Sequence, residues 1–385
     1  MNKRPIKTQK STRMTRILPV VLAIVVLLGG IAAWRAWAFA IRPLNLSLAD
    51  IARLPTSAQP AKKATLPANS TPGNATPVPT SIYVPGLAEN DILPTPENYV
   101  NPTPMGVLPS PTFAANARTI CGAPPVMFIL TAGLNNINEA DNADAVRIVR
   151  VDFTRPQVSV LSLEREIWTN IPDLESHGIT AMWFSSSYTF GEYLLGKGKG
   201  IYLLNKTIAQ NFGIDADHYA VVDLTSFAKA VDMVGGVDIY LSEPVVDNVW
   251  QHIDLGAGWH HLDGDTAMRF VRVRIYDSDW QRINRQTLVF KSLFTKLTAP
   301  ANLPKLPGLA VQLRDDFQTD LSPVEIGQLT CLAARLPKDQ IKFYEISPDM
   351  VTPITLKDKA QSQIMLPKWD LIRPYIQQFI NGTLP

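Results

Sequence analysis

The sequence predicts an α/β fold, a single three-layer α/β/α domain with a central mixed sheet that extends from about residue 118 to residue 385. Two observations support this prediction. Strand-like and helix-like segments alternate along this part of the chain, and helices that alternate with strands cover the faces of a sheet. No internal repeat divides these residues, so we expect one domain.

The first half of the predicted domain is rich in strands. Residues 126–130 form a short apolar run that is typical of a buried strand. Residues 145–153 and 157–163 alternate between apolar and polar side chains, and a turn at 154–156 separates them, which is a hairpin signature. Residues 200–213 have helical spacing and end on a glycine, which indicates a helix.

The second half continues the alternation. Residues 218–224 are expected to form a strand, and residues 225–236 a helix that Thr225 caps. The remaining predicted elements are a strand at 237–241, helices at 264–274, 279–298 and 322–336, a strand at 341–346, and a helix at 368–380.

A basic segment and an apolar run occupy the N-terminus. Residues 1–16 hold six lysines and arginines and no acid, and residues 17–34 are uncharged and apolar. About 20 apolar residues span a bilayer, and tryptophan favours the interface. We therefore expect a cytoplasmic basic tail at 1–16, a single-pass transmembrane anchor at 17–41, and an extracytoplasmic remainder in the cell membrane. The alternative is a cleaved signal peptide, but the bulky, charged end of the run favours the anchor.

Residues 42–117 are predicted to link the anchor to the domain. Proline, threonine, serine and alanine dominate most of this segment, and aromatic residues are few. Such a composition buries too little apolar surface to fold, and proline favours extended stretches. We therefore expect a disordered extracytoplasmic spacer.

The chain has two cysteines, Cys121 and Cys331. Two thiols are too few for a zinc site built from one chain. Because an extracytoplasmic domain lies in an oxidising compartment, we predict a disulfide between them. The alternative is two buried free thiols.

Five arginines fall within the seventeen residues 269–285, interleaved with apolar residues that look buried. The planar guanidinium binds phosphate oxygens in pairs. Two short arginine sets, joined by the tight connection 275–278, can converge on one point, and their number suits a pyrophosphate. The alternative is an arginine–aspartate ion-pair network that holds two helices together. Arg269 is expected to be a solvated helix position, and the formal net charge of +2 argues against nucleic acid.

A second charged cluster, residues 162–166, directly follows the strand predicted at 157–163. Ligands of α/β sheets bind at the carboxyl ends of strands, so this position also favours an anion site. With these residues in view, the chain resembles the LytR-CpsA-Psr family of cell-envelope glycopolymer transferases. The segments that carry the resemblance are "SLERE" (162–166), residues 212–239, and "HLDGDTAMRFVRVRIYDSDWQRINRQ" (261–286).

The resemblance implies a fold and an activity. Members transfer a glycopolymer from a polyprenyl pyrophosphate to a hydroxyl of peptidoglycan, assisted by magnesium, and the prenyl chain needs an apolar tunnel. By position, the resemblance assigns the roles here as follows: catalytic phosphate ligands Arg165, Arg272, Arg274, Arg282 and Arg285; substrate-binding residues Glu166, Asp279 and Gln286; and metal ligand Asp144.

The sequence departs from the family pattern in its metal loop. Gly133 stands where the family has an aspartate, and Asn142 where it has an arginine, so Asp144 alone remains. Asp141 or Glu139 could substitute from the same loop. Because Mg²⁺ uses one or two carboxylates and fills its shell with water and phosphate, we expect weak magnesium binding. Two other functions stay open: a degenerate protein that binds lipid-linked glycan or envelope partners without transfer, and a lipid pyrophosphate hydrolase.

Overall fold

The computed structural model describes part of the chain, all of it within the unit Leu44–Pro385. The described residues are 47–53, 93, 95–96, 99, 106–108, 111–113, 117–137, 142–274, 279–299, 301–302, 317–356 and 362–385. The predicted basic tail, the predicted anchor and most of the predicted spacer lie outside them. No helix in the described ranges is long and apolar enough to cross a membrane.

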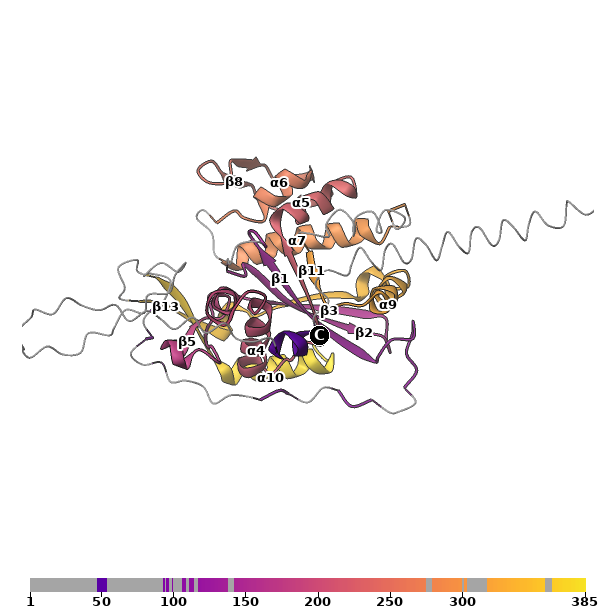
Figure 1. Cartoon of the computed structure of the whole chain (residues 1–385). Coiled ribbons are helices and arrows are strands. Elements are labelled where there is room, and N and C mark those ends of the chain that lie inside the picture. The colour runs from indigo at the N-terminus through magenta and orange to yellow at the C-terminus, as the bar shows by residue number, and fades with distance from the viewer. Residues whose placement is uncertain are drawn as a thin grey trace, which may run out of the picture. The chain divides into compact units, whose positions relative to one another are not determined.

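A six-stranded mixed sheet forms the centre of the domain (Figure 1), as the alternating pattern predicts. Three strands run antiparallel in chain order, and parallel strands flank them on both sides. Across the sheet, the strands are β11 (Phe317–Thr319), β6 (His218–Asp223), β1 (Val126–Leu134), β2 (Ala145–Asp152), β3 (Gln157–Leu163) and β12 (Ile341–Glu345). The predicted hairpin between residues 145 and 163 is confirmed.

One face of the sheet packs against the main hydrophobic core. Alternate residues of β1, including Phe128, Leu130 and Leu134, point into it. The helices that supply the other side of this core are α3 (Ser186–Phe190), α4 (Gly200–Phe212) and α10 (Trp369–Asn381), and α4 and α10 lie on the same side of the sheet in Figure 1. The short helix α2 (Leu48–Arg53) adds Ile51 to this core.

The opposite face of the sheet is divided along β1. Near the start of that strand, Met127 and Ile129 pack with Leu332 of α9 (Pro323–Ala333). A disulfide between Cys121 and Cys331 joins the chain just before β1 to the same helix, with the two Cα atoms 5.9 Å apart, so the predicted bond is present. The far end of β1 is not covered by α9, and this is where the functional site lies.

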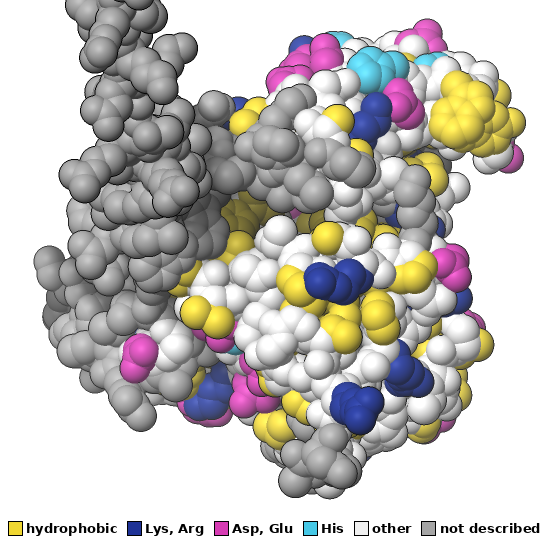
Figure 2. Space-filling view, turned by 90° about the vertical axis from the view of Figure 1, so that its right-hand side faces the viewer, with side chains coloured by type: hydrophobic (Ala, Val, Ile, Leu, Met, Phe, Trp, Pro, Cys, Tyr) yellow, Lys and Arg dark blue, Asp and Glu magenta, His cyan; other side chains and the backbone are white. Residues whose placement is uncertain are grey.

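A second lobe lies above that end of the sheet in Figure 1 and has its own apolar core. Its elements are α5 (Leu224–Met233), β7 (Val237–Leu241), β8 (Val245–Asp247), β9 (Ile253–Leu255), β10 (Gly258–Leu262), α6 (Gly264–Phe270) and α7 (Asp279–Leu297). Large hydrophobic side chains lie exposed on this lobe (Figure 2), among them Tyr240, Trp250 and Trp259.

Short elements complete the domain around a further small core that contains Trp168 and Phe190. They are β4 (Trp168–Asn170), β5 (Ala181–Trp183), β13 (Val351–Thr355), β14 (Gln363–Pro367), and the helical turns η2 (Glu175–His177) and η3 (Gly191–Leu195). Two further turns lie elsewhere in the chain: η5 (Lys338–Gln340) precedes β12, and η6 (Pro348–Met350) precedes β13.

Two sequence predictions at helix ends are wrong. Asp223, not Thr225, caps α5, because its carboxylate accepts a hydrogen bond from the backbone N–H of Ser226 at 2.7 Å. The helix predicted at 264–274 ends at Phe270 instead. Beyond it, Val271 and Val273 turn into the core of the second lobe, so the chain cannot keep its helical course.

The disulfide is expected to stabilise the fold. Because it closes a loop with a sequence separation of 210 residues, replacing both cysteines by serine should lower the free energy of unfolding by about 2–5 kcal/mol. Urea unfolding of the oxidised parent and of the double variant measures the difference. Reduced parent protein should match the variant. Equal unfolding midpoints for all three, or two free thiols in the denatured, unreduced parent, would contradict the prediction.

His218 is expected to make stability depend on pH. Its ring lies 3.5 Å from the carboxylate of Asp320 and 3.1 Å from that of Glu325. These contacts, chiefly with Asp320, raise the pKa of His218 despite its burial. The stabilisation is therefore complete below the ordinary histidine pKa of about 6.5 and is lost as the pH rises through the higher pKa of the folded state.

The matched variant for this prediction is His218→Gln, which cannot gain the charge. Between pH 6 and pH 9, the melting temperature of the parent should fall further than that of the variant. Parallel curves for the two proteins across this range would show that the histidine is not coupled to folding.

Candidate functional site

The site lies at one edge of the central sheet. Gly133 at the end of β1 pairs with Ala145 at the start of β2, and Val146 pairs with Leu163 at the end of β3. The last residue of β6, Asp223, pairs with Leu134. The carboxyl ends of three strands therefore meet at this edge, the position where α/β sheets bind ligands.

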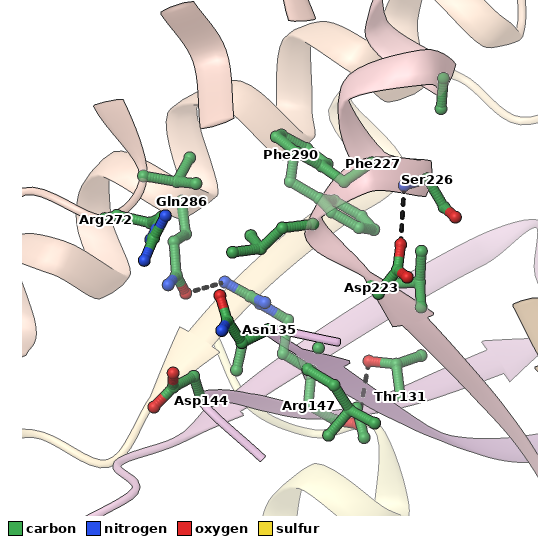
Figure 3. A pocket seen from close by; sticks show the side chains of 18 of the residues that line it. Thr131, Asn135, Asp144, Arg147, Asp223, Ser226, Phe227, Arg272, Gln286 and Phe290 are labelled. Atoms are coloured by element: carbon green, nitrogen blue, oxygen red, sulfur yellow. Dashed lines mark hydrogen bonds between the residues drawn. The ribbon is translucent and has the colours of Figure 1, made fainter. Parts of the chain in front are cut away.

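A cavity of about 510 Å³ opens here between the sheet and the helices α5 and α7 (Figure 3). Its polar lining includes Asp144, Arg147, Arg272, Arg274, Arg282 and Gln286. Its apolar lining includes Val222, Phe227, Ala230, Phe290, Leu293 and Phe317. In Figure 3, Arg272 and Asp144 lie toward one end of the cavity and Phe227 lies toward the other.

The helix α7 presents both kinds of lining in sequence. Arg282, Gln286, Phe290 and Leu293 all line the cavity. Their spacing of three or four residues places them on one face of the helix. Along this face the lining changes from a guanidinium through an amide to apolar rings and chains.

A charged network forms the polar end of the site. Arg165 donates to Asp144 Oδ1 at 2.6 Å through Nη1 and to Glu166 Oε1 at 3.0 Å through Nη2. Arg274 donates to the same Glu166 oxygen at 3.3 Å, and Nη1 of Arg282 lies 4.0 Å from Asp144 Oδ1. Three of the predicted arginines, from different parts of the chain, therefore share two carboxylates.

Buried side chains hold this network in place. The carboxylate of Glu164, which is fully buried, accepts a hydrogen bond from the backbone N–H of Glu166 at 2.9 Å. The hydroxyl of Ser185 donates to the backbone carbonyl of Arg165 at 2.9 Å. Both contacts fix the turn that carries the Arg165 and Glu166 side chains.

Two of the predicted arginines do not line the cavity, and one of them, Arg165, reaches its edge through the bond to Asp144. Arg285 does not line the cavity, and its Nη2 donates to the backbone carbonyl of Val273 at 2.7 Å in a buried position. It supports the segment after α6, on which Arg272 and Arg274 are carried. Arg269 pairs with Asp265 at 2.8 Å on the solvent side of α6, as predicted. The side chain of Asp279 lies outside the described residues.

Arg147 is a site residue that the sequence analysis missed. It lies in the middle of β2 opposite Thr131, is 8% exposed, and donates from Nη2 to Gln286 Oε1 at 3.0 Å (Figure 3). Its guanidinium carbon is 5.8 Å from the ring centre of Phe290. Burial, together with the nearby charge of Arg282, lowers the pKa of Arg147 to about 10. The one signal in the sequence was an arginine on a strand face whose other residues are apolar.

The metal loop contributes one carboxylate to the cavity edge. Gly133 and Asp144 lie side by side, because the backbone N–H of Asp144 donates to the carbonyl of Gly133 at 2.9 Å. Asp144 is 46% exposed. Within the described ranges, no three acidic, histidine or cysteine side chains cluster as metal ligands. Glu139 and Asp141, the predicted substitutes, lie outside those ranges.

Comparisons with known proteins show which family this chain is similar to. The LytR_cpsA_psr family model matches residues 127–365. The chain is 31% identical over 188 residues to the regulatory protein MsrR of Staphylococcus aureus, covering 48% of this chain and 53% of that protein. It is 26% identical over 194 residues to the polyisoprenyl-teichoic acid–peptidoglycan teichoic acid transferase TagT of Bacillus subtilis, covering 49% and 56%. The chain thus matches about half of the length of these relatives.

Solved structures share the fold. A crystal structure of TagV from B. subtilis superposes with a TM-score of 0.55 at 19% identity and covers 68% of this chain and 98% of that one. A structure described as TagT bound to LIIa-WTA superposes with a TM-score of 0.51 at 19% identity, covering 70% and 99%. Since the family model matches most of the domain and the fold agrees, this chain belongs to the LytR_cpsA_psr family.

Proposed function

We propose that this protein is an extracytoplasmic phosphotransferase that attaches a polyprenyl-pyrophosphate-linked glycopolymer to peptidoglycan. The observation that carries the proposal is the cavity lining, which joins a cluster of arginines to an apolar interior. A phosphate on a long hydrocarbon chain needs both surfaces in this order. The relative named as a teichoic acid transferase supports the same chemistry.

The charge of the site suits a pyrophosphate. Among the described residues of the site, the arginines Arg147, Arg165, Arg272, Arg274 and Arg282 outnumber the carboxylates, which are Asp144, Glu164, Glu166 and Asp223. Asp223 is already engaged as the cap of α5. Among these described side chains, positive charge therefore exceeds negative charge. This surplus favours anion binding over a purely structural role.

In the proposed reaction, one bond forms and one bond breaks at the sugar-linked phosphorus. A hydroxyl oxygen of peptidoglycan forms a bond to the sugar-linked phosphorus. The bond from that phosphorus to the bridging oxygen breaks, and this oxygen leaves on the lipid phosphate with the electron pair. The hydroxyl proton passes to solvent. Because phosphoryl transfer depends on positioning and on stabilising charge, arginines fixed around the phosphates supply the catalysis.

Magnesium fits this site only weakly. Asp144 would hold the ion together with phosphate oxygens and water, a donor set that Mg²⁺ accepts. When bound, it would add positive charge beside the phosphates. The single carboxylate also favours the second candidate, a protein that binds the lipid-linked glycan without transferring it.

We also propose that residues 17–41 anchor the protein in the cell membrane as a single pass, with the domain outside. The basic residues before the apolar run support this orientation. An anchored domain would meet a lipid-linked substrate at the membrane surface.

The full-length protein, incubated with a polyprenyl-pyrophosphate-linked glycan, peptidoglycan oligomers and Mg²⁺, tests the proposed activity. Transfer predicts that lipid monophosphate is released in step with glycan bound to peptidoglycan. Lipid retained without release would support the binding protein. Release that does not need peptidoglycan would support the hydrolase. If the protein neither binds the lipid nor releases it, all three functions are contradicted.

Arginine geometry should matter more than charge for ligand binding. Arg165→Lys and Arg274→Lys should each weaken the binding of farnesyl pyrophosphate about ten- to a hundredfold, because lysine keeps the charge but loses the paired donors. Calorimetric titration measures the affinity. Arg269→Lys, outside the cavity, is the control and should bind as the parent does. Lowered melting temperatures with unchanged affinity of the folded protein would instead favour the ion-pair network.

Restoring the missing carboxylate should strengthen magnesium binding. In Gly133→Asp, a second acid next to Asp144 should lower the Mg²⁺ concentration needed for half-maximal activity or farnesyl pyrophosphate binding several-fold. A Cβ at this position meets the Cβ of Ala145 at 3.2 Å, so a small shift is needed. Gly133→Asn has the same shape without the charge and is the control. Equal magnesium dependence of the two variants would rule out a metal at this loop.

A further inference from the structure

The cavity contains one arginine that lies apart from the charged network at its edge. Arg147 comes from the middle of β2, on the floor of the cavity, whereas Arg165 and Arg274 come from segments beyond the ends of β3 and α6. Its hydrogen-bond partner is the neutral amide of Gln286. Among the residues that the structure describes, no carboxylate lies within ion-pair distance of it, and its Nε has no hydrogen-bond partner.

This arrangement of a buried guanidinium is unfavourable. A buried charge normally requires a counter-charge or full hydrogen bonding, because its hydration is lost. Arg147 has neither among the described residues, and the positive charge of Arg282 lies near enough to disfavour its own. An anion between the two guanidiniums would remove both penalties at once.

The position of Arg147 also shows which part of a ligand it would meet. It is held by Gln286, which lies one turn farther along α7 than Arg282, a rise of about 6 Å. The next cavity residue on that helix face is Phe290, whose ring faces the Arg147 guanidinium. Arg147 therefore lies where the polar lining ends and the apolar lining begins (Figure 3).

We infer that Arg147 is a further substrate-binding residue, which contacts the phosphate that is joined to the lipid. This inference rests on the proposed function, since it places a lipid pyrophosphate in the cavity. In the transfer reaction this phosphate is the leaving group and gains negative charge as the bridging oxygen departs. A guanidinium in a low-dielectric cavity stabilises such charge more strongly than one at the surface. Arg147 would thus favour both lipid binding and departure of the lipid phosphate.

The test compares two probes, farnesyl monophosphate and farnesyl pyrophosphate, on the full-length protein. Arg147→Met keeps a long apolar side chain but removes the charge. It should weaken the binding of both probes about ten- to a hundredfold, since both carry the lipid-linked phosphate. Arg274→Lys should weaken the pyrophosphate more than the monophosphate, because Arg274 lies at the exposed end of the site. Arg269→Met is the control and should change neither affinity.

Melting temperature separates binding from a structural role. Without ligand, Arg147→Met should melt at or above the parent temperature, because an uncompensated buried charge is removed. Arg147→Lys, which keeps the charge, should bind better than Arg147→Met. A lowered melting temperature with parental affinity for both probes would show that Arg147 only holds α7 on the sheet and would overturn the inference. If the folded parent binds neither probe, the proposed function fails instead.

Discussion

Several guanidinium groups must stay close together at one edge of the sheet, and their mutual repulsion is the constraint on which the site depends. Two carboxylates, Asp144 and Glu166, offset part of that repulsion by bridging Arg165, Arg274 and Arg282. Buried Glu164 and Ser185 hold the turn that carries the Arg165 and Glu166 side chains. The fold thus keeps these guanidiniums close together, and the proposed anion would offset the repulsion that remains among them.

The division of one sheet face explains how the fold holds this charge. At the start of β1, the face is covered by α9, which the disulfide from Cys121 to Cys331 fastens to the chain next to the sheet. At the end of β1, α5 and α7 cover the same face but leave a cavity. The packed half positions the strands, and the other half places Thr131 and Arg147 in the lining of the cavity. The packed part and the proposed binding site are therefore neighbours on one face of the sheet.

Sequence patterns predicted five of the six strands of the central sheet, all except β11, and its long helices, because hydrophobic periodicity is a local property. They also predicted that Arg272, Arg274 and Arg282 share a site. They failed where the direction of a side chain depends on tertiary contacts. Spacing placed Arg285 beside Arg282, but it cannot show that the backbone carbonyl of Val273 is its partner.

Arg147 shows the same limit, because it lines the cavity although its sequence position did not indicate this. Its strand pattern predicts β structure correctly, but it does not show what covers each face of the strand. The fold covers one face with a packed core and leaves a cavity on the other. The role of this arginine can be inferred only from the folded structure, in which α7 places Gln286 and Phe290 in contact with it.

A crystal structure with farnesyl pyrophosphate and Mg²⁺ tests the central claim most directly. We expect the lipid-linked phosphate to lie within hydrogen-bond distance of Arg147 and the outer phosphate to lie between Arg274 and Arg282. The prenyl chain should lie along Phe227 and Phe290. A ligand bound outside this cavity, or one that places its prenyl chain at the arginine end, would contradict it.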